Sequence, residues 1–242
     1  MRGEVRAPSG GRAEREDMHI EPGVVHGAKM ALSYATAAGA GAYGLKLAFD
    51  EARAHGAAPL ALRSLAATLA VLVFFEVLPH VSVGVSEVHF ILGATLLLLL
   101  GTAPAAIGLA AGLLLQGLLL APTDLPMYAV NLTTLLAPLF AIQAVAERVV
   151  PRRTPYVDLR YRDVLALSAT YQGGVVAWVA FWALYGSGAG AENLAAIGAF
   201  GAAYLLVILI EPVASLAALA GAKGSRGLAR AGLLHPRLHH PA

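Results

Sequence analysis

The side chains with the greatest scope for chemistry are eight histidines, at positions 19, 26, 55, 80, 89, 235, 239 and 240. His19 directly follows Met18. If Met18 carries a free amino group, this amine, the backbone amide nitrogen of His19 and the Nδ1 atom of its imidazole can close two fused chelate rings around one metal ion. A planar set of nitrogen ligands suits Ni(II) or Cu(II). The pair therefore predicts a transition-metal site, provided that the chain begins at Met18.

His89 is the natural fourth nitrogen donor for this chelate. It lies in the sequence VSEVHF (85–90), at the expected outer end of a membrane helix. Ionisable groups at this depth are functional by default. Glu87 and Ser86 could hold the imidazole in one tautomer, as groups behind metal ligands usually do. The alternative is that His89 is only an interfacial polar residue.

Other polar residues could support the site or serve only the fold. Gln116 and Asn131 flank one short loop and could brace the metal site, although hydrogen bonding between helices is the simpler role. Glu76 needs a partner near the outer end of its helix, for which Lys29 is one candidate. His80 is expected to lie solvated in a loop, and the last three histidines belong to a polar tail.

The elements that must position these residues are membrane helices. Hydrophobic residues make up 58% of the 242 residues, charged residues only 13%, and the mean hydropathy is +0.68. A soluble domain carries roughly 25% charged residues, whereas a surface that faces lipid needs few. The net charge of +2 is too small to indicate nucleic-acid binding, and the absence of cysteine excludes disulfides and thiolate ligands.

A spanning helix needs about 20 mostly apolar residues. Candidate spans occupy residues 27–49, 58–79, 88–103, 105–121, 126–146, 164–185 and 194–220. The third and fourth are short and meet at a Gly-Thr-Ala-Pro turn, so a re-entrant hairpin is an alternative to two spans there. The sequence thus predicts an all-α, polytopic integral membrane bundle of about seven helices.

The basic residues predict the orientation of this bundle. They gather in the first and fifth loops and after the last span: Lys46, Arg53, Arg63; Arg148, Arg152, Arg153, Arg160, Arg162; Lys223, Arg226, Arg230 and Arg237. The loops near residues 80–87, 121–125 and 186–193 contain no Lys or Arg. Because cytoplasmic loops are enriched in Lys and Arg, we expect the N-terminus outside and the C-terminus in the cytoplasm, in the plasma (inner) membrane.

The expected spans and basic residues divide the chain into three segments. Residues 1–17 form a polar extension without the apolar core of a secretory signal, and we expect translation to start at Met18 instead. Residues 18–220 form the membrane domain with the metal site, and residues 221–242 form a basic cytoplasmic tail.

Several of these residues carry a family resemblance. The sequence MHIEPG (18–23) resembles the Met-His-Ile start and acidic–Gly turn of the cobalt/nickel-specific substrate-binding permeases of energy-coupling factor transporters, the CbiM/NikM type. His89 with Gly93 four residues later, Gln116 and Asn131 resemble that family's loop histidine, its Gln and its Asn. The resemblance runs over most of residues 18–220. The sequence departs from the family in having less Gly and Ser before His89 and seventeen residues before Met18.

The resemblance implies a seven-helix fold whose N-terminus is buried from the outer face. It implies a substrate metal, Co(II) or Ni(II), held by the amine of Met18, the amide and imidazole of His19, and the imidazole of His89. It also implies partners: a membrane coupling subunit, two cytoplasmic ATPases and a small extra membrane subunit. The chain itself has no Gly-x-x-x-x-Gly-Lys-Ser/Thr motif for ATP.

Two other functions remain open on sequence grounds. One is an intramembrane enzyme with a metal or haem held by His89 and another histidine. The chain has neither His-Glu-x-x-His nor Gly-x-Ser-x-Gly, and we expect no enzymatic activity and no resident cofactor. The other is a metal-independent membrane carrier with coincidental histidines.

Overall fold

The computed structural model describes Ile20 and residues 24–240 of the chain. Its long helices are α1 (Met30–His55), α2 (Ala57–Glu76), α4 (Thr102–Leu119), α5 (Tyr128–Val149), α6 (Tyr161–Ser187) and α7 (Ala191–Ala222). Two helices are short: α3 (Gly93–Leu100) and α8 (Arg226–Arg230). A hairpin of β1 (His80–Val83) and β2 (Ser86–His89) follows α2. Single 3-10 turns lie at Gly27–Lys29, Pro122–Met127, Tyr156–Asp158 and Pro236–Leu238.

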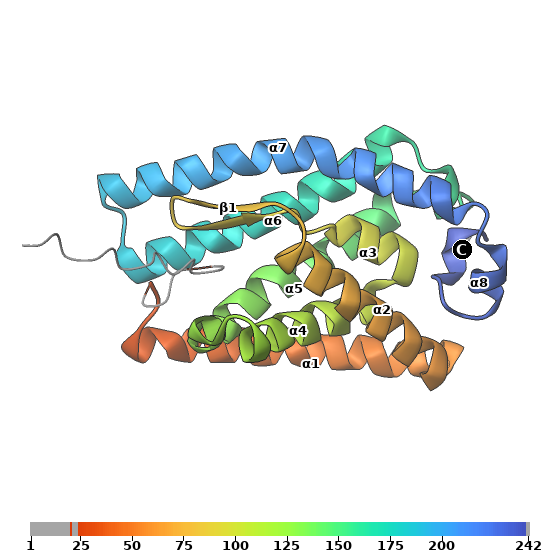
Figure 1. Cartoon of the computed structure of the whole chain (residues 1–242), viewed down its shortest axis with the longest axis horizontal. Coiled ribbons are helices and arrows are strands. Elements are labelled where there is room, and N and C mark those ends of the chain that lie inside the picture. Colours follow the sequence, from red (N-terminus) through yellow and green to blue (C-terminus); the bar gives the residue numbers. More distant parts are fainter. Residues whose placement is uncertain (1–19, 21–23, 241–242) are drawn as a thin grey trace, which may run out of the picture.

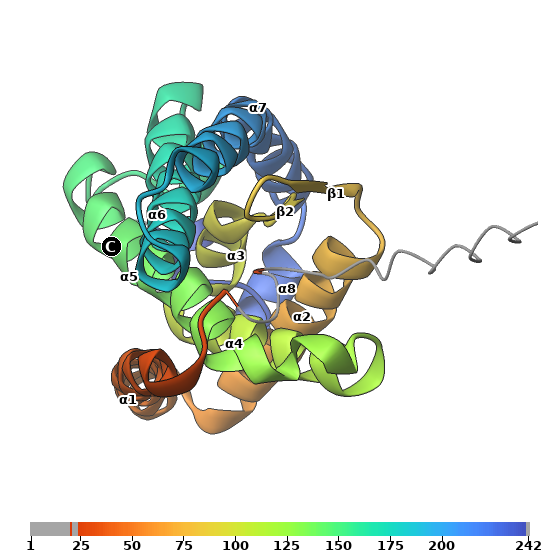
Figure 2. The same ribbon diagram turned by 90° about the vertical axis from the view of Figure 1, so that its left-hand side faces the viewer.

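The long helices pack side by side into a bundle (Figure 1). Seen from one end, α3 lies near the centre and α1 at the periphery (Figure 2). Large apolar side chains of α7, including Leu205, Leu206 and Leu209, face outward, as expected for a surface in contact with lipid. Within the described residues, five helices are long and apolar enough to cross a membrane: Ala57–Glu76, Thr102–Leu119, Pro122–Val149, Tyr161–Ser187 and Ala191–Ala222. The predicted helical, polytopic membrane fold is confirmed.

The third expected span is not a continuous helix. Residues 86–89 form strand β2, and helix α3 begins only at Gly93 and has 8 residues. The alternating sequence VSVGVSEV (81–88) favours a strand pair, and Gly84 takes the positive φ of +64° that the two-residue turn requires. The tip of the hairpin packs on Ala196 near the start of α7, whereas α3 ends beside His235. Strand and short helix together therefore run between the two ends of the bundle.

Close packing between α2 and α4 depends on a glycine. A Cβ atom at Gly108 would lie 2.7 Å from the backbone carbonyl carbon of Ala67. Small residues at such contacts let two membrane helices approach closely. The tight pair brings Gln116 of α4 beside Glu76 of α2, and the Gln116 Nε2 donates a hydrogen bond to the Glu76 Oε1 at 2.9 Å.

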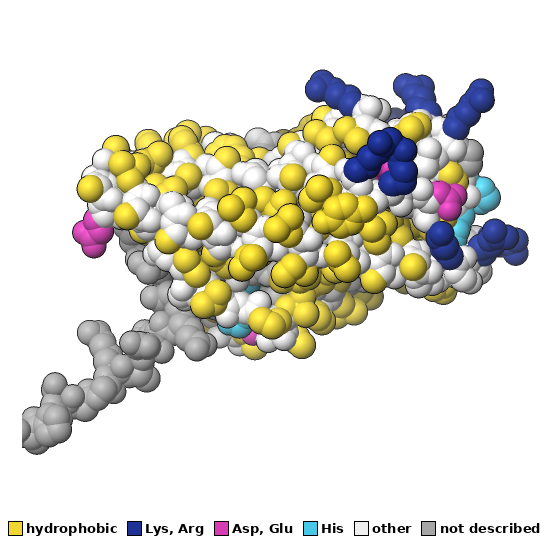
Figure 3. Space-filling model, turned by 90° about the horizontal axis from the view of Figure 1, so that it is seen from above, with side chains coloured by type: hydrophobic (Ala, Val, Ile, Leu, Met, Phe, Trp, Pro, Cys, Tyr) yellow, Lys and Arg dark blue, Asp and Glu magenta, His cyan; other side chains and the backbone are white. Residues whose placement is uncertain are grey.

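Charged residues divide the bundle into two unlike ends. Apart from Lys29, the Lys and Arg residues of the described part lie in or near the α1–α2 turn, the α5–α6 loop and the C-terminal segment, residues 223–240. We call this the basic end; Figure 3 shows most of the visible Lys and Arg side chains there. The opposite end holds the start of α1, the hairpin tip and the α6–α7 turn.

The C-terminal segment is packed against the basic end, so the expected solvated tail is wrong for His235. The backbone N–H of His235 donates to the carbonyl oxygen of Leu99 at 2.7 Å, and its ring stacks on Tyr156 with centroids 5.3 Å apart. Arg237 donates to the carbonyl oxygen of Pro151 at 2.8 Å, and Leu238 is fully buried. Desolvation lowers the pKa of His235 to about 4, so this imidazole is neutral at pH 7.

Candidate metal site

The β1–β2 hairpin positions His89 and Glu87. Its register pairs His80 with His89 and Ser82 with Glu87. Because side chains two residues apart on a strand share a face, Glu87 and His89 project together. The His89 Nε2 lies 3.1 Å from the Glu87 Oε2, while the Glu87 Oε1 accepts a hydrogen bond from the Ser82 hydroxyl at 3.1 Å. The carboxylate therefore lies close enough to interact with the imidazole through its charge.

The imidazole of His89 lies in the interior of the bundle. The residue is 1% exposed, its ring meets Phe75 edge-on with centroids 5.3 Å apart, and it stacks on His80 at the same centroid distance. A small cavity of about 30 Å³ adjoins it. Its described lining comprises Ile20, Ser86, Glu87, His89, Ile91, Asn131, Thr134, Leu135, Val175, Val179, Phe200 and Tyr204. A volume of this size suits a single ion or water molecule.

The N-terminal part of the chain reaches this cavity. Ile20 is 2% exposed and lines it, and Val25 is fully buried. Val24 lies against Gly186 near the end of α6, where a Cβ atom would come within 2.8 Å of the Val24 carbonyl carbon. The Lys29 Nζ donates to the carbonyl oxygen of Gly186 at 2.9 Å. Residues 24–29 therefore lie at the opposite end from the basic one.

Replacing Gly186 with alanine is expected to weaken metal binding roughly tenfold without touching any proposed ligand. The new methyl group would overlap the backbone of Val24, and overpacking of this kind costs about 1–3 kcal/mol, part of which the N-terminal segment would relieve by shifting. The measurement is the Co(II) dissociation constant of purified protein beginning at Met18.

Gly173→Ala is the matched control, because Gly173 lies in the same helix and a Cβ atom there meets nothing within 4 Å. Its affinity should equal that of the parent protein. Equal affinities for all three proteins would show that the position of the N-terminal segment has no bearing on the metal.

The structure brings together four of the predicted site residues. Ser86, Glu87, His89 and Asn131 all line the same cavity and are all buried. Met18 and His19 lie outside the described residues. In the described structure no group of three or more His, Asp or Glu side chains is placed to hold a metal ion, so His89 and Glu87 need further donors from elsewhere.

Two of the predicted pairings differ from the structure. Gln116 does not line the cavity of His89; it hydrogen-bonds Glu76 and lines a second small cavity that also touches Asn131. A bracing role for Gln116 at the metal site stays a prediction. Lys29 contacts Gly186 and the ring of Tyr185, not Glu76, because the α2–α4 pair already supplies Glu76 with an amide donor.

His80 is a neighbour of the site that sequence reasoning missed. Treated as a solvated loop residue, it in fact stacks on His89 across the hairpin. The alternation of small polar and β-branched residues around Gly84 was the available signal. This alternating pattern spans the end of an expected loop and the start of an expected helix. Neither part alone is long enough to show the two-residue period of a strand.

A second missed feature is a buried carboxylate next to the segment that carries His89. Glu211 of α7 is fully buried and accepts hydrogen bonds from Ser168, from the Gln172 Nε2 at 2.9 Å and from the backbone N–H of Ala94 at 3.1 Å. The Gln172 Nε2 also donates to the carbonyl oxygen of Ile91 at 2.7 Å. Glu211 thus ties the start of α3 to α6 and α7.

Together these features define a class of protein: a multi-pass membrane protein with a buried imidazole and carboxylate beside an ion-sized cavity. A family model described as cobalt uptake substrate-specific transmembrane region, CbiM, matches residues 19–226. The chain belongs to this family, and the predicted resemblance is confirmed. It is a membrane component of cobalt or nickel uptake, and a transport-component family agrees with the expected lack of enzymatic activity. Searches of curated proteins and of solved structures found no match.

Proposed function

We propose that this protein is the substrate-capture subunit of an ATP-driven energy-coupling factor importer. It binds Co(II) or Ni(II) at its outer face through the amine of Met18, the amide nitrogen and imidazole of His19, and the imidazole of His89. One observation carries the proposal: Ile20, which is covalently bonded to His19, lines the same cavity as His89. This shared lining by residues distant in sequence supports a site formed by His19 and His89.

The residues around His89 support this assignment. The Glu87 Oε2 lies 3.1 Å from the Nε2 atom of His89, and its charge favours a proton on that nitrogen, so Nδ1 would be the ligand. Asn131 and Ser86 place neutral oxygen and nitrogen atoms on the cavity wall. A site that is small and buried excludes most of the hydration shell, so the ion must exchange water for protein donors.

The charge distribution supports the orientation. The basic end carries nearly all Lys and Arg residues of the described part, so it faces the cytoplasm by the positive-inside rule. The cavity beside His89 and the N-terminal segment then open toward the outer side. Because the chain has no ATP-binding motif, import needs partners: a membrane coupling subunit, two cytoplasmic ATPases and a small extra membrane subunit.

The decisive test compares three forms of the protein by metal content. Protein that begins at Met18 is expected to retain one Co(II) or Ni(II) per chain. Protein that retains residues 1–17, and protein with three alanines inserted ahead of Met18, should retain almost none. The insertion is the sharper control, because it keeps every side chain, converts the amine of Met18 into an amide, and moves the free amine too far along the chain to chelate one ion together with His19.

Acid provides an independent check on the same preparations. The proposed ligands must be deprotonated to bind the metal, so protons compete with the ion for the amine, the amide and the imidazoles. Affinity should therefore fall steadily from pH 8 to pH 5. Stoichiometric metal in all three forms, or an affinity that does not change over this range, would rule out the amine–imidazole chelate.

A further inference from the structure

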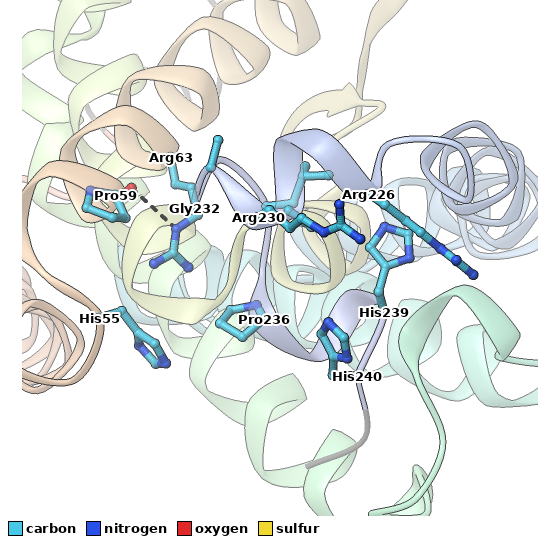
Figure 4. A pocket seen from close by; sticks show the side chains of 12 residues that line it. His55, Pro59, Arg63, Arg226, Arg230, Gly232, Pro236, His239 and His240 are labelled. Carbon is cyan, nitrogen blue, oxygen red and sulfur yellow. Dashed lines mark hydrogen bonds between the residues drawn. The ribbon is translucent and has the colours of Figure 1, made fainter.

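A large cavity opens at the basic end, far from His89. It measures about 610 Å³ and lies between the α1–α2 turn and the C-terminal segment. Figure 4 shows Arg226, Arg230 and His239 on one side of it, with Pro59 and Arg63 on another. Its lining among the described residues contains no Asp or Glu. The cavity is therefore suited to an anion.

Two arginines supply its available positive charge. Arg63 is already engaged, because it donates to Glu51 at 2.5 Å and to the carbonyl oxygen of Leu100 at 3.0 Å. The same carboxylate lies 3.0 Å from the imidazole of His55. Arg226 and Arg230 are exposed and make no ion pair within residues 24–240. Guanidinium groups bind phosphate oxygens through paired N–H donors.

The surroundings of the cavity are apolar and face outward. Pro59 lines the cavity, and Leu62, three residues later on the same face of α2, is 48% exposed. Leu65, further along the helix, is 57% exposed. An anion that entered this cavity could lay an attached hydrocarbon chain against α2. A free phosphate would make no use of these leucines.

We propose that the cavity binds the phosphate headgroup of an anionic membrane lipid, with Arg226 and Arg230 on the phosphate and an acyl chain along Leu62 and Leu65. Basic cavities beside membrane helices on the cytoplasmic side are suited to such headgroups. The proposal is independent of the metal site, since none of these residues lies near His89. The bound lipid would hold the C-terminal segment against the α1–α2 turn.

The test uses the full chain in nanodiscs of phosphatidylcholine with a minority of phosphatidylglycerol. Native mass spectrometry counts phosphatidylglycerol retained by the parent protein, by the double variant Arg226→Gln/Arg230→Gln and by the control Arg148→Gln/Arg153→Gln. The control removes the same charge from exposed positions of the basic end outside the cavity. We expect retention to fall roughly tenfold or more in the first variant, at about fivefold per arginine, and less than twofold in the control.

Three outcomes would overturn the proposal. Equal losses of phosphatidylglycerol in the two double variants would mean that the overall positive charge of the basic end attracts the lipid, and not the cavity. Equal retention of phosphatidylcholine and phosphatidylglycerol would mean that the cavity does not select lipids by the charge of the headgroup. Displacement of the lipid by millimolar inorganic phosphate would assign the cavity to a soluble anion. Matching elution volumes and far-UV circular dichroism spectra of the three proteins show that the fold is intact.

Discussion

Replacing His89 with alanine should lower the affinity for Co(II) or Ni(II) by roughly 100-fold or more in protein that begins at Met18. His89 is 1% exposed and borders the cavity, so a ligand from the solvent cannot readily replace its imidazole. Losing even a group behind a metal ligand costs about 10–100-fold in affinity, and losing a ligand should cost at least as much. Equilibrium dialysis with each metal measures the effect.

Two further substitutions make this result specific. Glu87→Gln keeps the shape of the side chain but removes the charge that orients the imidazole of His89, so it should cost about 10–100-fold. His55→Ala removes an imidazole from the basic end and should leave affinity unchanged. Stoichiometric, tight metal binding by the His89→Ala protein would overturn the assignment of His89 as a ligand.

Replacing Glu211 with alanine is expected to destabilise the protein by about 3 kcal/mol or more. It would leave the donors of Ser168, Gln172 and Ala94 without their carboxylate acceptor in the bundle interior, and each such buried group costs about 1–3 kcal/mol. For a chain of this size the loss corresponds to a fall in melting temperature of about 6–12 °C. Thermal unfolding in nanodiscs measures the change, and hydrogen exchange at Ala94 locates it.

Two variants separate this network from a general effect of removing acid groups. Glu211→Gln keeps one oxygen acceptor and should cost roughly half as much, with the network partly preserved. Glu192→Ala removes an exposed carboxylate from the start of the same helix and should cost less than about 1 kcal/mol. If the Glu211→Ala protein has the same melting temperature as the parent protein, the carboxylate does not hold α3 in place.

The membrane helices could be predicted because their signal is local. Long apolar runs with few charges give α2, α4, α5, α6 and α7 to within three residues at each end, since the bilayer imposes both length and composition. The prediction of the third span as one helix was wrong for a physical reason. The expected span begins at residue 88, but Val88 and His89 pair with β1 and stay extended, so the helix begins only at Gly93.

Local sequence also indicated most of the site, but not how it is assembled. Buried polar residues at 86, 87, 89 and 131 stood out in an apolar chain, and the structure places them on one cavity. Gln116 stood out equally and binds Glu76 instead. Which of two buried polar residues meets which partner depends on helix rotation and register, and neither is encoded in a short window of sequence.

By itself, the sequence determined the class of protein, its membrane helices, its basic end and its family, because composition, hydropathy and a few motifs are properties of short segments. Only the tertiary structure decided that Ile20 borders the cavity of His89, that His80 stacks on this histidine, and that Glu211 binds the start of α3. These contacts join residues distant along the chain. They arise when the packing of whole helices fixes the relative positions of segments that local patterns leave independent.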